Sequence, residues 1–106
     1  MAKLKKGNMS KITITVKDKE GIEYKMVLRE PGFSELSLAY NAYLSGFAAG
    51  KTGMPDIPKA GKILIDLCLI EAESDKVFAT NELMLFNAAL KAAEIVETFD
   101  TELKKN

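Results

Sequence analysis

Two segments near the start of the chain alternate between apolar and polar residues, which is the pattern of half-buried β-strands. The first is residues 11–17, and after the link 18–21 the alternation resumes through Leu28. Gly21 can supply the positive φ that a short hairpin loop needs. The sequence therefore predicts an antiparallel hairpin whose apolar face another element must cover, since a lone hairpin is marginal in water. That face comprises Ile12, Ile14, Val16, Ile22, Tyr24, Met26 and Leu28.

A first helix is predicted from Phe33 to Gly46 or Ala49, because Pro31 cannot donate to a strand ladder and ends the second strand. Its large apolar side chains recur at steps of three and four residues, so they share one face. Such stripes usually face inward. We expect this stripe to be core that covers the hairpin, with a binding groove as the alternative. It comprises Phe33, Leu36, Tyr40, Tyr43 and Phe47.

The second predicted helix runs from Ile57 or Lys59 to Glu73. Its centre, residues 63–70, is apolar at every position except Asp66. A helix that is apolar on nearly all sides is central in its domain or shared with a neighbouring subunit. A buried strand is the alternative for so short an apolar run. Helix is favoured because the amphipathic pattern extends beyond the run.

The third helix is predicted from Asn81 to Leu103, with Thr80 or Asn81 as its N-cap. Its apolar stripe comprises Leu85, Ala89, Ala92, Val96, Phe99 and Leu103. Small side chains would let another helix approach closely here, because interaxial distance depends on side-chain size. They are Ala88, Ala89, Ala92 and Ala93.

These elements predict a mainly helical α+β fold, with an N-terminal antiparallel hairpin packed on three helices. A chain of 106 residues is long enough for one domain. We expect a flexible basic arm over residues 1–10 and a single domain over 11–106. Residues 1–29 carry a net charge of +5 in a chain of net charge zero, which leaves −5 for the remainder. This asymmetry could favour self-association or an acidic partner. Chance variation in surface charge would also produce it.

The residue types argue against an enzyme. The chain has no His, so it lacks the usual general base near neutral pH and the commonest metal ligand. Its one cysteine, Cys68, cannot form an internal disulfide. Asp66 could have a raised pKa if buried, but we expect it to lie at the solvent edge of the helix or to pair with Lys62 at i,i+4. No catalytic residue, cofactor or small-molecule substrate is therefore predicted.

Two further patterns resemble binding motifs without matching them. Gly50-Lys51-Thr52 ends like a phosphate-binding loop but has Ser45 where that loop needs Gly, and it follows a helix instead of a strand. The acids Glu71, Glu73 and Asp75 have the spacing of alternate calcium ligands but lack the rest of that loop. We expect neither a nucleotide site nor a metal site.

The basic N-terminal residues carry no interleaved aromatic residues and no apolar run follows them, so neither nucleic-acid binding nor a secretory signal is expected. The most apolar run, residues 63–70, is far shorter than the roughly 20 residues of a membrane span. We expect a cytoplasmic protein with no membrane partner.

Two stretches carry a resemblance to a known family. "LREPGFSELSLAYNAYL" contains Arg29, Pro31, Gly32, Glu35 and Leu36 at the start of a helix, and "GKILIDLCLIEAESD" contains the Leu/Ile-rich run from Ile63 to Glu71. Residues 11–103 resemble the small tail assembly chaperones of long-tailed bacteriophages and prophages. The resemblance implies a non-enzymatic protein that binds the tape measure protein and keeps its apolar helices soluble in the bacterial host cytoplasm.

Three alternatives remain: a structural virion or connector component, a protein-interaction module of a mobile element, and a small enzyme that uses acidic residues. A homo-oligomer is also possible. The candidate surface for a partner, or else for the core, comprises Phe33, Tyr40, Tyr43, Phe47, Leu85, Ala89, Ala92, Val96 and Phe99.

Overall fold

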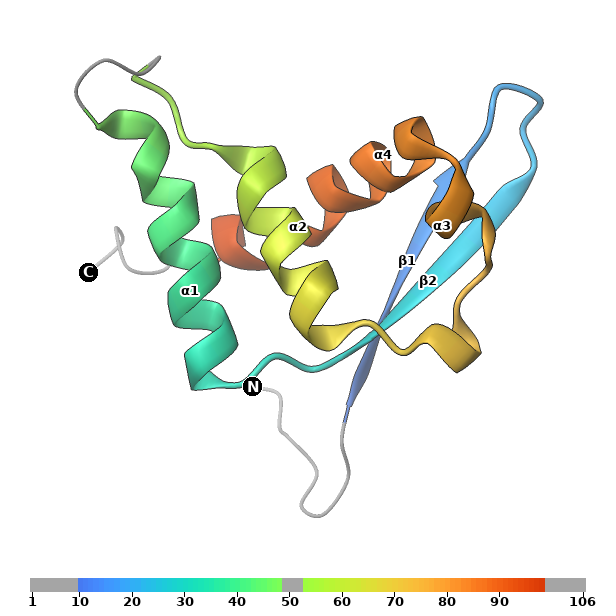
Figure 1. Ribbon diagram of the computed structural model, residues 1–106, viewed down its shortest axis with the longest axis horizontal. Coiled ribbons are helices and arrows are strands. Elements are labelled where there is room, and N and C mark those ends of the chain that lie inside the picture. The colour runs from blue at the N-terminus through green and yellow to red at the C-terminus, as the bar shows by residue number, and fades with distance from the viewer. Residues whose placement is uncertain (1–9, 49–52, 99–106) are drawn as a thin grey trace.

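The computed structural model, which describes residues 10–48 and 53–98, has an N-terminal hairpin followed by helices (Figure 1). It confirms the predicted α+β fold. The strands are β1 (Lys11–Lys17) and β2 (Glu23–Arg29). The helices are α1 (Phe33–Leu44), α2 (Ile57–Cys68), α3 (Val77–Thr80) and α4 (Glu82–Ala92), with 3₁₀ turns η1 (Ser45–Phe47) and η2 (Glu71–Glu73).

The hairpin has the predicted antiparallel register, with Ile14 opposite Met26. Gly21 has a φ of 85°, as its place in the loop requires. The Asp18 carboxylate fixes that loop by accepting hydrogen bonds from the backbone N–H groups of Glu20 and Ile22. Ile22 was predicted on the apolar face, but it lies in the loop and is half-exposed, because β2 begins one residue later.

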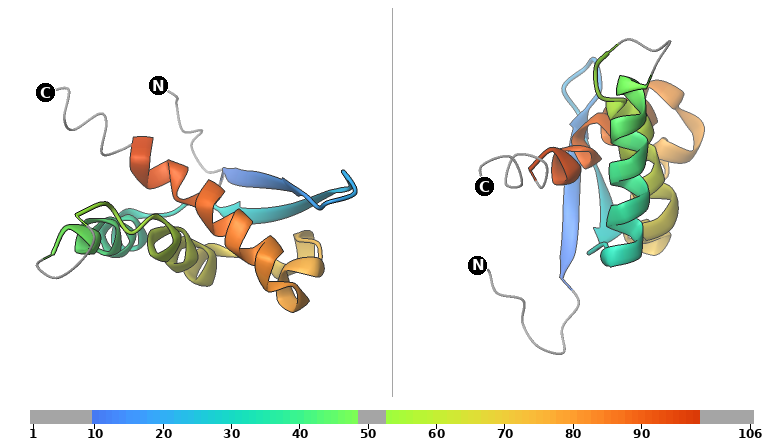
Figure 2. Two further views of the ribbon diagram at one scale, coloured as in Figure 1. Left: turned by 90° about the horizontal axis from the view of Figure 1, so that it is seen from above. Right: turned by 90° about the vertical axis from the view of Figure 1, so that its left-hand side faces the viewer.

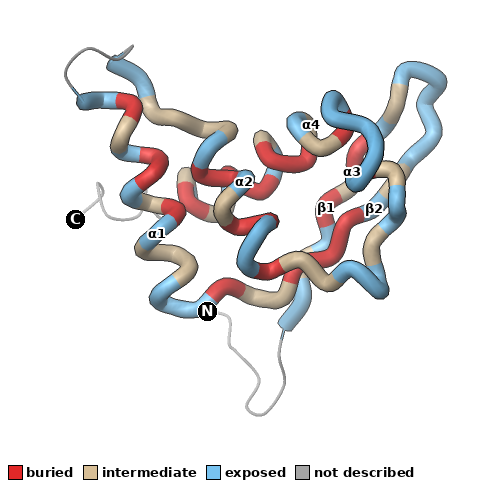
Figure 3. Tube along the Cα trace, viewed as in Figure 1, coloured by how far each residue is buried: buried red, intermediate tan, exposed pale blue. Residues whose placement is uncertain are grey.

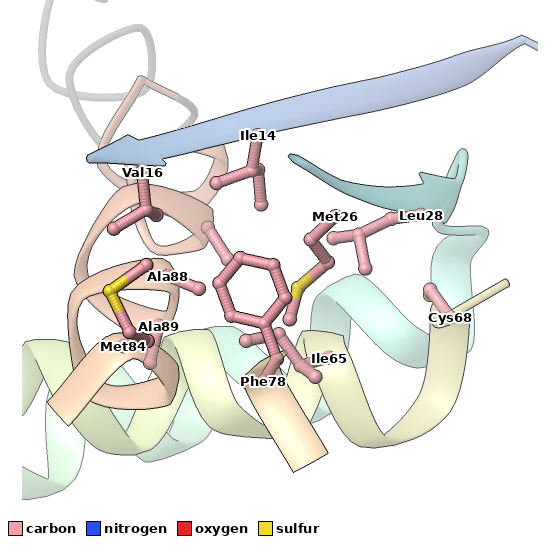
Figure 4. Close-up of a cluster of buried hydrophobic side chains, with 11 residues drawn as sticks. Ile14, Val16, Met26, Leu28, Ile65, Cys68, Phe78, Met84, Ala88 and Ala89 are labelled. Atoms are coloured by element: carbon pink, nitrogen blue, oxygen red, sulfur yellow. The ribbon is translucent and has the colours of Figure 1, made fainter. Parts of the chain in front are cut away.

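The helices gather on one face of the hairpin (Figure 2), and α4 and α2 make the contacts with it. Figure 4 shows Phe78 of α3 between the hairpin and Ile65 of α2. The two residues belong to a buried cluster that covers the apolar face of the hairpin, as predicted. Its buried members are Ile14, Val16, Met26, Leu28, Ile65, Cys68, Phe78, Met84, Ala88, Ala89 and Ala92.

The prediction that α1 covers the hairpin is wrong. α1 packs against the opposite side of α2, where Tyr43 and Ala39 join a second buried cluster with Leu64 (Figure 1). The stripe on α1 is only partly core, since Phe33 is 87% exposed and Phe47 is 50% exposed. Phe33 is the first residue of α1, and Phe47 lies in η1 after the helix has ended.

α2 is the central helix, as its apolar composition predicted, because it packs against both α1 and α4. The closest approach to α4 is at Gly61. A Cβ placed there would lie 1.7 Å from the carbonyl oxygen of Ala89, so only glycine fits. The expectation that the alanines of the last helix permit close approach is therefore confirmed at this crossing.

α2 ends at Cys68 and not at the predicted Glu73. Leu69 is extended and forms a β-bridge with Leu28, and the Ile70 N–H donates to the Val27 carbonyl at 2.8 Å. The outer edge of β2 supplies the physical reason, since its backbone groups need partners that a helix could not provide.

Ser74 and Asp75, which follow in the chain, also bond to the outer edge of β2. The Ser74 hydroxyl accepts from the Val27 N–H at 2.9 Å. Asp75 exchanges two bonds with Lys25, one from its N–H to the Lys25 carbonyl and one from the Lys25 N–H to its carboxylate. Residues 69–75 thus close the outer edge of β2.

The last helix is shorter than predicted. Asn81 is its N-cap, as expected, and accepts from the Met84 N–H at 3.1 Å. α4 ends at Ala92, and residues 94–98 are helical again after a turn at Ala93. The Val96 N–H bonds to the Ala93 carbonyl three residues back, which tightens the backbone at this break. The predicted stripe members Phe99 and Leu103 lie outside the described residues.

An ion pair fixes the turn from β2 into α1. The Arg29 guanidinium donates to the Glu35 carboxylate at 3.0 Å and to the Leu67 carbonyl at 3.0 Å. The second carboxylate oxygen of Glu35 accepts from the Gly32 N–H at 2.7 Å, at the N-terminus of α1. The bond from Arg29, and then the bond from the Gly32 N–H, lower the pKa of Glu35.

Replacing Gly61 with alanine should destabilise the protein although alanine is the better helix former. The new Cβ meets backbone of α4, so the two helices must separate. We expect Gly61→Ala to lower the free energy of unfolding by about 1–3 kcal/mol in urea denaturation. Ser34→Ala, on the exposed surface of α1, should change it by less than about 0.5 kcal/mol. Equal stabilities would show that the helices do not cross this closely.

Glu35 should contribute to the loss of stability in acid. Its pKa is lowered in the folded state, so its stabilising effect is present above the ordinary carboxyl pKa and is lost as the pH falls through the lowered value. The free energy of unfolding of Glu35→Gln should therefore fall less between pH 6 and pH 3 than that of the natural protein. Glu94→Gln, at an exposed site on the last helical segment, should keep the natural pH dependence.

Candidate functional site

A hollow with an apolar floor lies between α2 and the segment that contains η2 and α3. Its volume is about 430 Å³. Its floor is formed by side chains from β2, α2, α3 and α4, and its rim is polar. The apolar lining comprises Met26, Ile65, Leu69, Phe78, Ala79 and Leu85, and the polar lining comprises Lys62, Asp66, Glu71, Ser74, Asp75, Lys76 and Thr80.

Two further hollows continue this one along α2. One of about 460 Å³ shares Lys62 and Leu85 with it and is also lined by Pro58, Glu82, Phe86 and Ala89. The other, of about 390 Å³, is lined by Ile65, Asp66, Leu69 and Glu71. We name the three together the α2 groove. It follows a helix of 12 residues, so it is roughly 18 Å long.

The local structure explains why this side of α2 is open. α3 has only four residues, and the extended Asn81 then turns the chain into α4. The segment from η2 to α3 is largely exposed in Figure 3, unlike the buried inner side of α4. One short helix cannot cover α2 from Pro58 to Leu69, so the groove remains between the elements.

The rim of the groove carries more acidic than basic side chains. Four carboxylates, those of Asp66, Glu71, Asp75 and Glu82, face only two ammonium groups, those of Lys62 and Lys76. The Lys62 ammonium lies 3.0 Å from Asp66, which confirms the predicted i,i+4 pair. Asp66 is exposed at the solvent edge, as expected. The rim therefore favours a ligand with basic groups beside an apolar surface.

Two of the three acids considered for metal binding are engaged elsewhere. Glu73 pairs with Lys11 at 2.8 Å, and the Asp75 carboxylate accepts from the Lys25 N–H at 2.7 Å. Across residues 10–48 and 53–98, no three His, Cys, Asp or Glu side chains lie together in a way that could hold a metal ion. The groove thus offers surface for contact and not a set of converging ligands.

Cys68 does not reach the groove. Its side chain is only 1% exposed, within the cluster beneath the hairpin (Figure 4). Burial raises the pKa of its thiol, although Arg29 acts in the opposite direction. A buried, protonated thiol is a poor nucleophile.

The nine residues predicted as partner-binding or core surface separate into four groups. Leu85 and Ala89 line the groove. Phe33 and Phe47 are exposed on or beside α1, away from the groove. Four more residues are buried or partly buried in the core: Tyr40, Tyr43, Ala92 and Val96. Phe99 lies outside the described residues, as do Gly50-Lys51-Thr52 and the predicted arm up to residue 9.

Phe86 is an exposed aromatic residue of the groove that the sequence pattern did not identify. It is 48% exposed and lines the groove beside Leu85. Its position off the inward stripe of α4 was the available signal, because a large apolar residue on the wet side of an amphipathic helix lacks a partner within its own fold.

Comparison of the chain with protein-family models, curated proteins and solved structures found no match. No helix in the described part of the chain has both the length and the apolar character needed to cross a membrane.

Cys68 should react slowly with thiol reagents in the native protein, since its thiol is buried and its pKa is raised. We expect Ellman's reagent to modify it at least about 100-fold more slowly in buffer than in urea, where the cluster opens. Equal rates would mean that this part of the core is not formed. The Ser34→Cys variant, at an exposed site, provides the fast reference in the native state.

Proposed function

We propose that this protein is a non-enzymatic tail assembly chaperone of a bacteriophage or prophage. It binds an apolar helix of the tape measure protein in the α2 groove and keeps that client soluble in the host cytoplasm. The observation that carries the proposal is the groove itself, which has an apolar floor beside the central helix and half-exposed Phe86 at its side.

The shape of the groove favours a helical ligand. An amphipathic helix binds by placing its apolar face into a hydrophobic groove. A groove of roughly 18 Å accommodates about 12 residues of helix, or three turns. Phe86, which is half-exposed, would lose contact with water when such a helix binds. Burial of apolar surface is the dominant favourable term in most protein association.

The rim supports the same role. The carboxylates of Glu71 and Glu82 surround the apolar floor, so the surface stays charged and hydrated before a client arrives. They also favour a helix with basic residues beside its apolar stripe. A chaperone needs this combination, because it must offer apolar contact without aggregating itself.

The identity of the client comes from the resemblance to tail assembly chaperones. The residues that carry it have structural roles: Arg29 and Glu35 fix the start of α1, and residues 63–68 belong to α2, which forms one wall of the groove. The resemblance thus falls on the framework that supports the groove. The tape measure protein, which is rich in long apolar helices in this class of phage, is the proposed ligand.

Co-expression with the tape measure protein of the same phage or prophage tests the proposal. We expect the client to be soluble and to copurify. Phe86→Ala should weaken binding by tenfold or more, within the range for central aromatic contacts. Phe33→Ala removes a phenylalanine outside the groove that is even more exposed than Phe86, and it should bind normally.

Three results would contradict this proposal. An insoluble, unbound client would remove the chaperone function. Weaker binding in Phe33→Ala than in Phe86→Ala would move the site to α1. Recovery of the protein in stoichiometric amount from purified particles would instead support a structural virion component.

A further inference from the structure

The two edges of the hairpin differ. The outer edge of β2 is covered by residues 69–75, which bond to the backbone of Val27 and Lys25. Within residues 10–48 and 53–98, no other segment forms backbone–backbone hydrogen bonds with the outward-facing groups of β1, and the sheet contains these two strands alone. An open strand edge presents unpaired N–H and C=O groups to any extended chain that approaches it.

The register identifies the backbone groups on the open edge. Val27 and Lys25 direct their backbone groups away from β1, so the intervening Met26 pairs with Ile14. Because alternate residues of an antiparallel strand face opposite edges, the outward-facing set on β1 is Lys11, Thr13, Thr15 and Lys17. The Ser10 carbonyl, one position before β1, accepts from the Glu30 N–H, which agrees with this alternation.

Lysines surround this edge. The Lys91 ammonium of α4 donates to the outward Thr15 carbonyl at 2.8 Å. Lys11 and Lys17 stand at the two ends of the strand and are exposed, with Lys11 also paired to Glu73. Lysine on an edge strand discourages uncontrolled pairing. The same charges attract an acidic segment.

We propose that the β1 edge binds an extended acidic segment of a partner protein, which adds a third strand to the sheet. Main-chain hydrogen bonds to Thr13 and Thr15 provide the pairing, as in other cases of strand addition. Carboxylates opposite Lys11 and Lys17 provide the selectivity. A carboxylate of the bound segment also pairs with the Lys91 ammonium. Lys91 then releases the Thr15 carbonyl, which becomes available for main-chain pairing. This site is separate from the α2 groove and does not depend on the function proposed for it.

A second copy of the chain is the less suitable occupant. The sequence "KITITVK" reads nearly the same in both directions, so two β1 strands could pair antiparallel about Ile14. That register places Lys11 of each chain opposite Lys17 of the other. Like charges directly opposite one another destabilise a strand pair.

Two peptides test the proposal by NMR titration. The probe is acetyl-Glu-Val-Thr-Val-Thr-Val-Glu-amide, whose carboxylates align with the two terminal lysines of β1. The control has Lys at both Glu positions and thus imitates β1 itself. We expect the acidic probe to shift the amide signals of Thr13 and Thr15 and slow their hydrogen exchange. It should bind on the order of tenfold more tightly than the control.

A backbone variant separates strand addition from simple charge attraction. Thr13→Pro removes an N–H that the hairpin does not use, and proline is tolerated on edge strands. It should leave the spectrum folded and abolish binding of the acidic probe. Thr13→Ala keeps the N–H and should bind as the natural protein does.

Several results would overturn the proposal. They are the absence of shifts at 2 mM probe, equal binding of both peptides, or undiminished binding to folded Thr13→Pro. Protection of the Thr13 and Thr15 amides without peptide, together with a dimer in sedimentation, would instead make a second copy the occupant. Loss of client binding in Phe86→Ala has no bearing on this test, so the two proposals fail independently.

Discussion

The close crossing of α2 and α4 at Gly61 is the constraint on which the rest of the structure depends. The Ala89 carbonyl lies where a Cβ of residue 61 would be, so any other residue would push the helices apart. With α4 held this near, Met84 and Ala88 reach the hairpin, while the far side of α2 remains available to α1. Both buried clusters therefore meet on α2, and its third side is left as the groove.

Periodicity predicted the elements whose burial is local. Alternation gave the hairpin, and the spacing of three and four gave α1 and α4, because one side of each element is buried along its length. It was wrong for residues 69–73, which were predicted as helix, since an apolar run is equally compatible with helix and strand. Hydrogen bonds to Val27 and Lys25, which lie far earlier in the chain, decide that segment. Periodicity also does not specify which neighbouring element covers the apolar stripe of a helix. For this reason Phe33 was expected in the core.

The groove was only partly predictable for a related reason. Leu85 and Ala89 were identified as apolar surface, and the Lys62–Asp66 pair followed from i,i+4 spacing. A groove, however, is a space between elements. Its existence depends on the four-residue length of α3 and on the turn at Asn81, and neither leaves a periodic signal. Sequence shows which residues are apolar, but only the assembled fold shows which of them lack a partner.

The two proposed surfaces recognise different kinds of ligand, and their opposite charges distinguish those ligands. The groove contacts side chains and has an acidic rim, whereas the β1 edge contacts backbone and is surrounded by lysines. On these two proposals, the lysines of the edge disfavour a basic amphipathic helix, and the carboxylates of the rim disfavour an acidic extended segment. A client with both kinds of segment gains further, because binding of one raises the effective concentration of the other.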